Sequence, residues 1–405
     1  MELTARRPAV GLAVLFTVAL TTITTETLPM GLLPQMSDGL GASQDRIGWL
    51  VGGYSLVIIV ITMPLATMTA RLDRRRLLVL IMGLFAVGNA LLAIAPNYPT
   101  ALLARLVTAS GHGVLWSAMA GYAASLVTRD KAGRAVAVVF AGNSAALTAG
   151  VPLGTLLGQA AGWRTGFAVL SGLSALLLVA ARILLPEQAA SPAPSGLRGA
   201  LRLPSVRIVT AATALVMLGQ FTLHTYLVPY LGDADQSGRA TTVALFVFGA
   251  AGILGVWAAG LLADRGTGRY LLVTLGLHVA AIAVLPVTGG AVTIAVIAVW
   301  GLAYAALPTL LQTFALKTAP HAVAAASTLF IIAFNLGITA GSTLGGQTLR
   351  LLGPGPLPVA AALPVLAAAA TIAAGLHRAR KLPRPAHARQ AGAATGDPAA
   401  ARQRA

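Results

Sequence analysis

Twelve apolar stretches, each long enough to cross a lipid bilayer, determine what this chain of 405 residues can fold into. A transmembrane helix needs about 20 predominantly apolar residues. Hydrophobic residues make up 57% of the chain and charged residues only 10%, whereas a soluble protein has about 25% charged residues. The sequence therefore predicts an all-α membrane protein, because helices satisfy their backbone hydrogen bonds without water.

The stretches fall into two sets of six, separated by a Pro/Ser-rich segment. The first set is predicted over residues 9–33, 46–70, 77–95, 98–127, 134–160 and 164–185, and the second over 206–231, 240–263, 270–288, 291–316, 322–349 and 356–377. We expect an N-terminal six-helix bundle over 1–185, a cytoplasmic linker over 186–204, a C-terminal six-helix bundle over 205–378 and a disordered basic tail over 379–405.

The distribution of basic residues predicts the orientation of the helices. The chain has 28 Lys and Arg residues and 11 Asp and Glu residues, a net charge of +17 that is also typical of nucleic-acid-binding proteins. Alternating loops place 23 of the 28 on the side of the N-terminus and 4 on the other side, with Arg105 inside a stretch. Because cytoplasmic loops are enriched in Lys and Arg, we expect both termini in the cytoplasm of a multi-pass protein in the plasma or inner membrane. The excess charge then indicates orientation and contact with anionic lipid, with no nucleic-acid partner.

Several classes of enzyme and metal protein are excluded by residues that the sequence lacks. There is no Cys, so disulfides, zinc–thiolate sites and iron–sulfur clusters are excluded. None of the three Lys residues follows a Gly and no His precedes a Glu, which excludes a Walker A loop and the His-Glu-x-x-His zinc motif. The sequence shows no nucleophile–base pair, and we expect neither an enzyme, nor a cofactor, nor a metal.

Two charged residues remain deep inside the apolar stretches, Glu26 and Arg105. A charge at the centre of a transmembrane helix costs about 2.5–3.5 kcal/mol on insertion scales, so we interpret both residues as proton-coupling residues. Glu26 lies in a threonine-rich segment over residues 21–29, where a desolvated carboxyl group could bind and release a proton. Solvation of Glu26 at the outer interface is the alternative. Arg105 could control when Glu26 releases its proton, or it could clamp backbone carbonyl groups.

Other polar and aromatic residues in the stretches are candidates to line a substrate cavity. They are Thr25, Tyr54, His112, Trp116, Asn143, Gln220, His224, Tyr226, Tyr304, Gln312 and Asn335. Any one of them alone is more typical of packing or of the membrane interface than of ligand binding. The set is therefore a hypothesis about the cavity rather than a motif.

Two segments follow in part the pattern G-x-x-x-D-R-x-G-R-R, which we call the signature. In residues 66–75, Arg71, Arg74 and Arg75 match the signature, while Ala66, Ala70 and Asp73 replace its two glycines and its acid. The corresponding segment of the second half keeps Gly260, Asp264 and Arg265. Both segments resemble a signature of the major facilitator superfamily. The recurrence of one signature after the linker indicates two related halves.

The fifth stretch is similar to the antiporter motif of this family, with Gly150, Pro152, Gly154 and Gly158. Glycines four residues apart let a neighbouring helix approach closely, and Pro152 is expected to kink the helix. A packing stripe of small residues is the alternative. Arg105 matches the arginine of a fourth-helix motif. The first stretch, from Glu26 onward, resembles the twelve-spanning drug:proton antiporters, and within them the arabinose-efflux and chloramphenicol-efflux permeases.

The resemblance implies twelve helices in two bundles that rock about a central cavity. It implies a secondary transporter that exports small amphipathic molecules, such as a drug, sugar or metabolite, by proton antiport. Glu26 would then exchange protons, Arg105 would tune it, and the signature residues would act in gating. A proton-coupled importer and an uncoupled uniporter are the alternatives. The expected partners are a small-molecule substrate, protons and the lipid bilayer, and the family expectation is a monomer.

Overall fold

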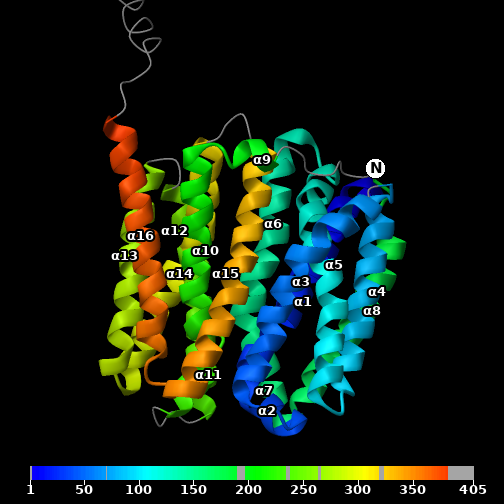
Figure 1. The fold of residues 1–405 in the computed structure, drawn as a ribbon. Coiled ribbons are helices and arrows are strands. Elements are labelled where there is room, and N and C mark those ends of the chain that lie inside the picture. The colour runs from blue at the N-terminus through cyan, green and yellow to red at the C-terminus, as the bar shows by residue number, and fades with distance from the viewer. Residues whose placement is uncertain are drawn as a thin grey trace, which may run out of the picture.

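The computed structural model describes residues 2–69, 71–188, 197–233, 238–262, 266–318 and 323–381. In this described part the chain is helical, without a strand, and its long helices form two halves of six that lie side by side (Figure 1). This arrangement confirms the predicted fold class.

The first half contains the helices that precede the predicted linker. They are α1 (Glu2–Gly31), α3 (Gln44–Met68), α4 (Arg74–Ala93), α5 (Tyr98–Ser125), the interrupted helix α6–η2–α7 (Ala132–Ala145, Ala146–Gly150 and Val151–Ala161) and α8 (Trp163–Leu184). A short helix, α2 (Leu33–Leu40), joins α1 to α3, and a 3-10 turn, η1 (Arg129–Lys131), precedes α6.

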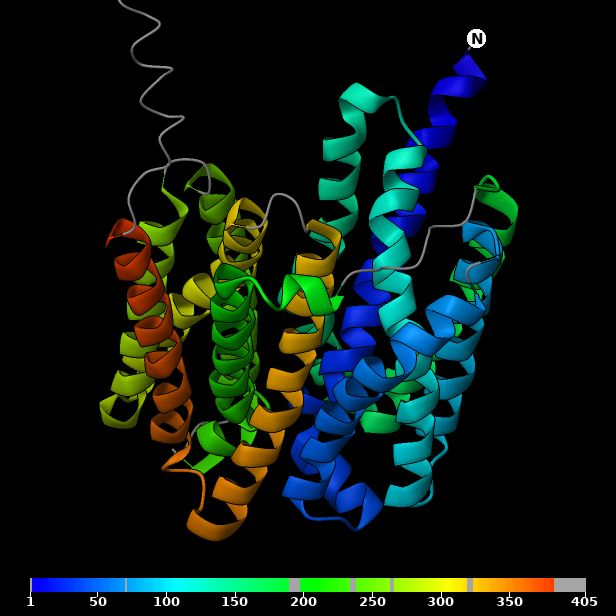
Figure 2. The ribbon, with the colours of Figure 1, turned by 45° about the horizontal axis from the view of Figure 1, so that its top comes forward.

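The second half contains the remaining long helices. They are α10 (Pro204–His224), α12 (Gly238–Leu262), α13 (Thr267–Val284), α14 (Gly290–Thr318), α15 (Val323–Leu352) and α16 (Leu357–Lys381). Short elements connect them: α9 (Leu197–Ala200), α11 (Leu227–Asp233) and η3 (Leu285–Val287). Helix α9, within the predicted linker, packs on α15, and its Ala200 joins Val206 at the start of α10 in a small buried cluster with Ala325 and Leu329 of α15 (Figure 2).

Among the described residues, eleven helical segments are long and apolar enough to cross a membrane. The remaining long helix, α5, carries Arg105 and His112 and packs against α1, α3, α4 and α6. Its polar side chains are thus covered by protein rather than by lipid, which is how charged residues are tolerated at membrane depth.

The predicted helices differ from the observed ones mainly where the chain bends. The predicted helix over 9–33 ends at Gly31, and α2 begins separately because the ring of Pro34 cannot continue the hydrogen-bond ladder. The predicted helix over 206–231 ends at His224, where the amide of Tyr226 turns back to the carbonyl of Leu223 at 3.0 Å before α11. The segment 189–196 of the predicted linker and residues 382–405 of the predicted tail lie outside the described residues.

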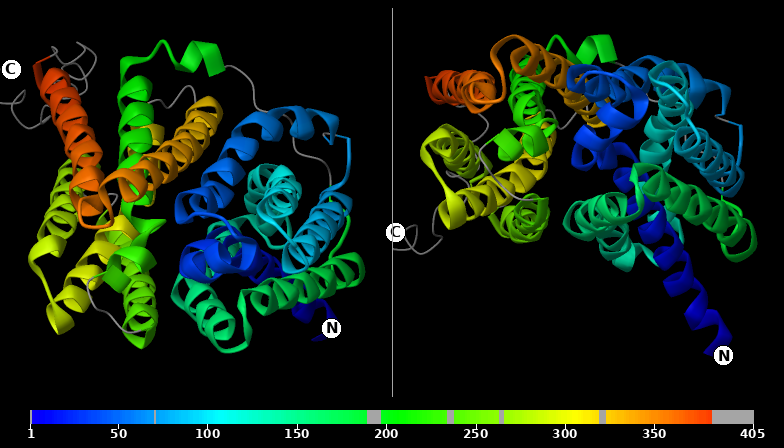
Figure 3. Two further views of the ribbon diagram at one scale, coloured as in Figure 1. Left: turned by 60° about the horizontal axis from the view of Figure 1, so that its bottom comes forward. Right: turned by 90° about the horizontal axis from the view of Figure 1, so that it is seen from below.

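The two halves repeat one packing pattern. In the first half, α1 packs on α6 and α8, α3 packs on α5, and α4 packs on α5 and α8. In the second half, α10 packs in the same way on α15 and α16, α12 on α14, and α13 on α14 and α16. The right-hand view of Figure 3, seen from below, shows these two groups of helices side by side. The recurrence is that expected of transporters built from structural repeats.

The halves contact each other through the second and fifth helices of each, α3 on α15 and α12 on α6–η2–α7. Between α3 and α15, Thr339 Oγ1 donates to the carbonyl of Gly52 at 3.0 Å, and Ser342 Oγ donates to the carbonyl of Gly48 at 2.8 Å. Helices α2 and α11 meet at the same end of the molecule. We name it the α2/α11 end; the opposite, termini end holds the start of α1 and the last turn of α16 (Figure 1).

The contact between α12 and η2 lies at a wide, π-helical turn. The amide of Val151 donates to the carbonyl of Ala146, five residues back, directly before Pro152. Pro152 has no N–H for an ordinary helical turn, and a widened turn accommodates its ring. The predicted kink thus takes the form of a π turn. A Cβ atom on Gly249 of α12 would lie only 2.5 Å from Thr148 Cα, so only glycine fits here against the backbone of the other half.

A glycine stripe on α15 allows the closest packing within the second half. A Cβ atom on Gly341 would lie 3.1 Å from the Cα of Leu218 on α10, and Gly337 and Gly345 also face the α10 backbone. Gly341→Leu should therefore force α10 and α15 apart and destabilise the protein by about 1–3 kcal/mol or more, the usual cost of overpacking. Thermal unfolding of the purified protein in detergent measures this effect.

The matched control for this prediction is Gly276→Leu in α13. Gly276 is an exposed helical glycine with no heavy atom within 4 Å of its built Cβ atom, so the same substitution meets open space. A melting temperature that falls equally in both variants would contradict the packing explanation.

Candidate functional site

Glu26 is buried between helices of the first half rather than solvated at an interface. Only 8% of the surface of Glu26 is exposed. Its Oε2 atom lies 3.5 Å from Nε2 of His112, which is near the middle of α5. The other ring nitrogen of His112, Nδ1, is 2.8 Å from the hydroxyl of Tyr54 on α3. We name Glu26, Tyr54, Arg105 and His112 the Glu26 site.

The guanidinium of Arg105 binds backbone carbonyls of two other helices. Nε donates to the carbonyl of Leu50 on α3 at 3.0 Å, while Nη1 and Nη2 donate to the carbonyls of Thr25 and Glu26 on α1 at 2.6 and 2.8 Å. The Arg105 residue is fully buried, and its Cζ lies 4.2 Å from the centre of the Tyr54 ring, in cation–π contact.

The sequence of α1 explains why a carbonyl is available there. Pro29 lies inside α1 and has no N–H, so the carbonyl of Thr25, four residues earlier, has no intrahelical donor. Arg105 supplies the missing donor. The observed contacts of Arg105 are those of a clamp on backbone carbonyls, which was the alternative interpretation of this residue. The carboxyl group of Glu26 contacts His112 rather than the Arg105 guanidinium.

A second polar contact joins α1 to α4. Asn89 Nδ2 donates to Thr25 Oγ1 at 3.1 Å, and both residues are fully buried. With Arg105 this bond fixes the segment of α1 that carries Glu26 against α3, α4 and α5. The site can therefore hold a carboxyl group that binds and releases a proton in a fixed position, next to an imidazole that can donate to it.

The second half contains an aromatic cluster, which we define as Phe221, His224, Phe248, Trp300 and Tyr304. The rings of His224 and Phe248 stack with centroids 4.8 Å apart, and Trp300 lies edge-on to both. Trp300 Nε1 donates to Gln220 Oε1 at 2.9 Å. Helices α10, α12 and α14 supply these residues.

Buried polar atoms without a partner surround this cluster. Within the described residues, no hydrogen-bond partner is found for Gln220 Nε2, His224 Nδ1, or either ring nitrogen of His278 on α13. An unpaired buried polar atom costs about 1–3 kcal/mol, so each calls for a partner such as water or a ligand. These atoms provide hydrogen-bonding capacity beside aromatic faces.

The Glu26 site and the aromatic cluster belong to different halves, and an electrostatic interaction between Glu26 and Tyr304 links them. The carboxylate of Glu26 lies within electrostatic range of the Tyr304 hydroxyl. On the first half the aromatic surface continues from His112 to Trp116, with ring centroids 6.2 Å apart, and the Trp116 indole nitrogen has no partner among the described residues. The structure thus brings together seven of the eleven predicted cavity residues in two groups: Thr25, Tyr54, His112, Trp116, and Gln220, His224, Tyr304.

The other four predicted cavity residues lie elsewhere or bond locally. Tyr226 is at the α2/α11 end, where its hydroxyl donates to the carbonyl of Ser342 at 2.9 Å. Asn335 Nδ2 donates to its own helix at the carbonyl of Ile331, 3.0 Å away. Gln312 is exposed on α14, and Asn143 is half-buried on α6.

The signature residues after α3 form local ion pairs at the termini end. Asp73 caps α4 by accepting from the amide of Arg76 at 2.9 Å, and it also pairs with the Arg76 guanidinium. Arg75 pairs with Glu187, which follows α8. An Asp is a favourable N-cap, which accounts for its presence where the signature has a glycine. These ion pairs connect parts of the first half.

The remaining signature residues are placed as follows. Arg71 is exposed, Arg74 lies against Gly121 of α5, and Gly260 is exposed with open space around it. Asp264 and Arg265 lie outside the described residues.

The glycines of the antiporter-like motif face α1 and Leu32, the residue between α1 and α2. A Cβ atom on Gly154 would lie 2.7 Å from Leu28, and Gly150 and Gly158 face Thr24 and Leu32 in the same way. The stripe on α15 packs against α10 at equivalent places, so close packing is a property of both halves.

Sequence reasoning missed Asn89, Phe248 and Trp300. Asn89 is an amide inside an apolar stretch, and this signal could have identified it. Phe248 and Trp300 carry no such signal, because large aromatic residues are common on both lipid-facing and buried sides of membrane helices.

Comparison with known proteins identifies the family. The sequence model of the Major Facilitator Superfamily matches residues 15–395. A protein of Mannheimia succiniciproducens named "Probable sugar efflux transporter" is 32% identical, over 82% of this chain and 84% of that protein. The inner membrane transport protein YdhP of Escherichia coli O157:H7 is 34% identical, over 84% of this chain and 89% of its own length.

Solved structures show the same fold at low identity. A bacterial homologue of the human lysosomal transporter Spinster, in an inward-facing and unoccupied conformation, superposes with a TM-score of 0.72 at 16% identity, covering 91% of this chain and 94% of that one. The nucleoside transporter NupG, in a mutant form, gives a TM-score of 0.77 at 12% identity, covering 90% and 99%. The chain therefore belongs to the major facilitator superfamily of membrane transporters.

Proposed function

We propose that this transporter exports small amphipathic molecules, sugars among them, in exchange for protons. One observation carries the proposal: the carboxyl group of Glu26 is buried within the first half, in contact with His112 and within electrostatic range of Tyr304 of the second half. Buried ionisable groups inside a membrane bundle are a feature of proton pathways.

The contacts between the halves suggest how exchange would occur. The halves touch along α3 and α15 at the α2/α11 end and at the π turn beside Gly249. Rocking about the second contact would open one end while closing the other, so that Glu26 meets protons from one side at a time. Antiport requires that the proton and the substrate use this central region alternately.

The aromatic cluster supports a sugar-like substrate. The apolar face of a sugar ring can lie against Trp300 or Phe248, while its hydroxyl groups pair with the unpartnered atoms of Gln220 and His224. Relatives named as sugar efflux transporters support the same substrate class and the direction of export. Drugs with an apolar ring and polar substituents would fit the same chemistry.

We further propose that both termini lie in the cytoplasm, because 23 of the 28 basic residues lie on that side. The α2/α11 end would then be the outer one, and the protein would work as a monomer in the inner membrane within the drug:proton antiporter group. The name of the Escherichia coli relative supports the inner membrane.

Inverted membrane vesicles that contain the protein test this function. Respiration acidifies their interior, and a panel of sugars and antibiotics is then added. A transported substrate should raise the internal pH, reported by a fluorescent amine, and should accumulate inside until an ionophore collapses the gradient. Accumulation unaffected by the ionophore would indicate a uniporter, and substrate flux coupled to protons moving in the same direction would indicate an importer.

A further inference from the structure

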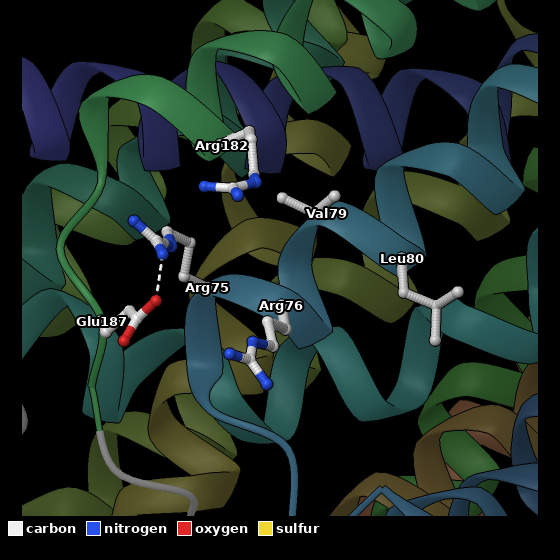
Figure 4. Close-up of a pocket in the computed structure, with 6 residues that line it drawn as sticks. All are labelled: Arg75, Arg76, Val79, Leu80, Arg182 and Glu187. Carbon is white, nitrogen blue, oxygen red and sulfur yellow. Dashed lines mark hydrogen bonds and ion pairs between the residues drawn. The ribbon is translucent and has the colours of Figure 1, made fainter.

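A basic pocket lies at the termini end of the first half, away from the Glu26 site. Its cavity is about 260 Å³ and is lined by Arg75, Arg76, Val79 and Leu80 of α4, by Arg182 of α8 and by Glu187 (Figure 4). The α4 residues come from its first two turns and Arg182 from the last turn of α8.

Positive charge exceeds negative charge in this pocket. Arg75 pairs with Glu187, and Arg76 pairs with Asp73 at 2.9 Å. Arg182 is exposed and forms no ion pair with any described residue. One guanidinium is therefore available for an added anion, with two more beside it. Guanidinium groups bind phosphate through paired N–H donors.

The pocket continues into an apolar surface. Leu80, Val87 and Leu91 on α4 are exposed, and so are Val179 and Ile183 on the adjacent α8. In a membrane this surface contacts acyl chains. The arginines lie at the level of the lipid headgroups, because α4 begins and α8 ends there. The pocket thus offers a site for an anionic group directly joined to an apolar one.

We propose that this pocket binds the phosphate of an anionic phospholipid, with Arg182 as the principal headgroup contact and the acyl chains along α4 and α8. A free phosphate ion would use the arginines but leave Val79 and Leu80 without a partner. Phosphatidylcholine has the same chains but no net charge. The combination of charge and apolar surface therefore favours a lipid such as phosphatidylglycerol.

Native mass spectrometry of the full chain, purified with defined lipids, tests the proposal. The wild type should retain phosphatidylglycerol in preference to phosphatidylcholine, and Arg182→Gln should weaken retention of phosphatidylglycerol at least fivefold. The control is Arg134→Gln on α6, which removes an exposed charge at the same end outside the pocket and should leave retention within twofold of wild type.

Three outcomes would overturn the lipid site. Equal retention of the two lipids would show that the charge of the headgroup plays no part in binding. Equal losses of phosphatidylglycerol in Arg182→Gln and Arg134→Gln would show that binding depends on the overall charge of this end rather than on the pocket. Displacement of the lipid by millimolar inorganic phosphate would identify a site for a free anion. Arg182→Lys, which keeps the charge but not the paired donors, should recover part of the retention that Arg182→Gln loses. Equal melting temperatures of wild type and variants in detergent would show that the losses do not come from unfolding.

Discussion

Glu26→Gln should reduce proton-driven transport to the level of vesicles without the protein. The amide of glutamine has nearly the shape of the carboxyl group but binds no proton in this pH range, so it removes the charge change and keeps the packing beside His112. In inverted vesicles, addition of substrate should no longer raise the internal pH. Exchange of labelled for unlabelled substrate needs no net proton movement, and we expect it to persist.

Asp38→Asn is the matched control, because Asp38 is an exposed acid on α2 and its substitution removes the same charge outside the site. Proton-coupled transport should stay at the wild-type level in this variant. If Glu26→Gln transports against the gradient as the wild type does, Glu26 is not the proton carrier. If exchange is lost as well, Glu26 is needed for structure or for substrate binding.

Arg105→Lys should lower both stability and transport, although it preserves the charge. An ammonium group on a flexible stem cannot reach the carbonyls of Thr25, Glu26 and Leu50 together, as the planar guanidinium does. Each carbonyl that loses its donor in the buried site costs about 1–3 kcal/mol. We expect a clear fall in melting temperature and at least a tenfold lower transport rate.

A double-mutant cycle with Pro29→Ala separates the two roles of Arg105. Alanine restores an N–H that can pair with the carbonyl of Thr25, so the loss of stability caused by Arg105→Lys should be smaller in the Pro29→Ala background. Strictly additive effects, together with normal transport by Arg105→Lys, would favour a role of Arg105 through its charge alone.

The membrane fold was predictable from the sequence because the requirement for crossing a bilayer is local. Whether a stretch can cross depends on its own length and apolarity, and the predicted stretches match the observed long helices. The exceptions have local causes that pattern alone does not resolve: the break at Pro34 separates α2 from α1, and the ring of Pro152 is accommodated by a π turn rather than a simple kink.

The sequence also determined which charged residues the membrane helices must bury, because the cost of burying Glu26 or Arg105 in a membrane is a property of each residue. Only the tertiary structure decided what these residues contact. Residues 25, 54, 89 and 105 come from four helices, and their contacts depend on how each helix is rotated about its axis. The missing N–H of Pro29 and the rotation of α5 direct Arg105 to backbone carbonyls, which leaves the carboxyl group of Glu26 facing His112.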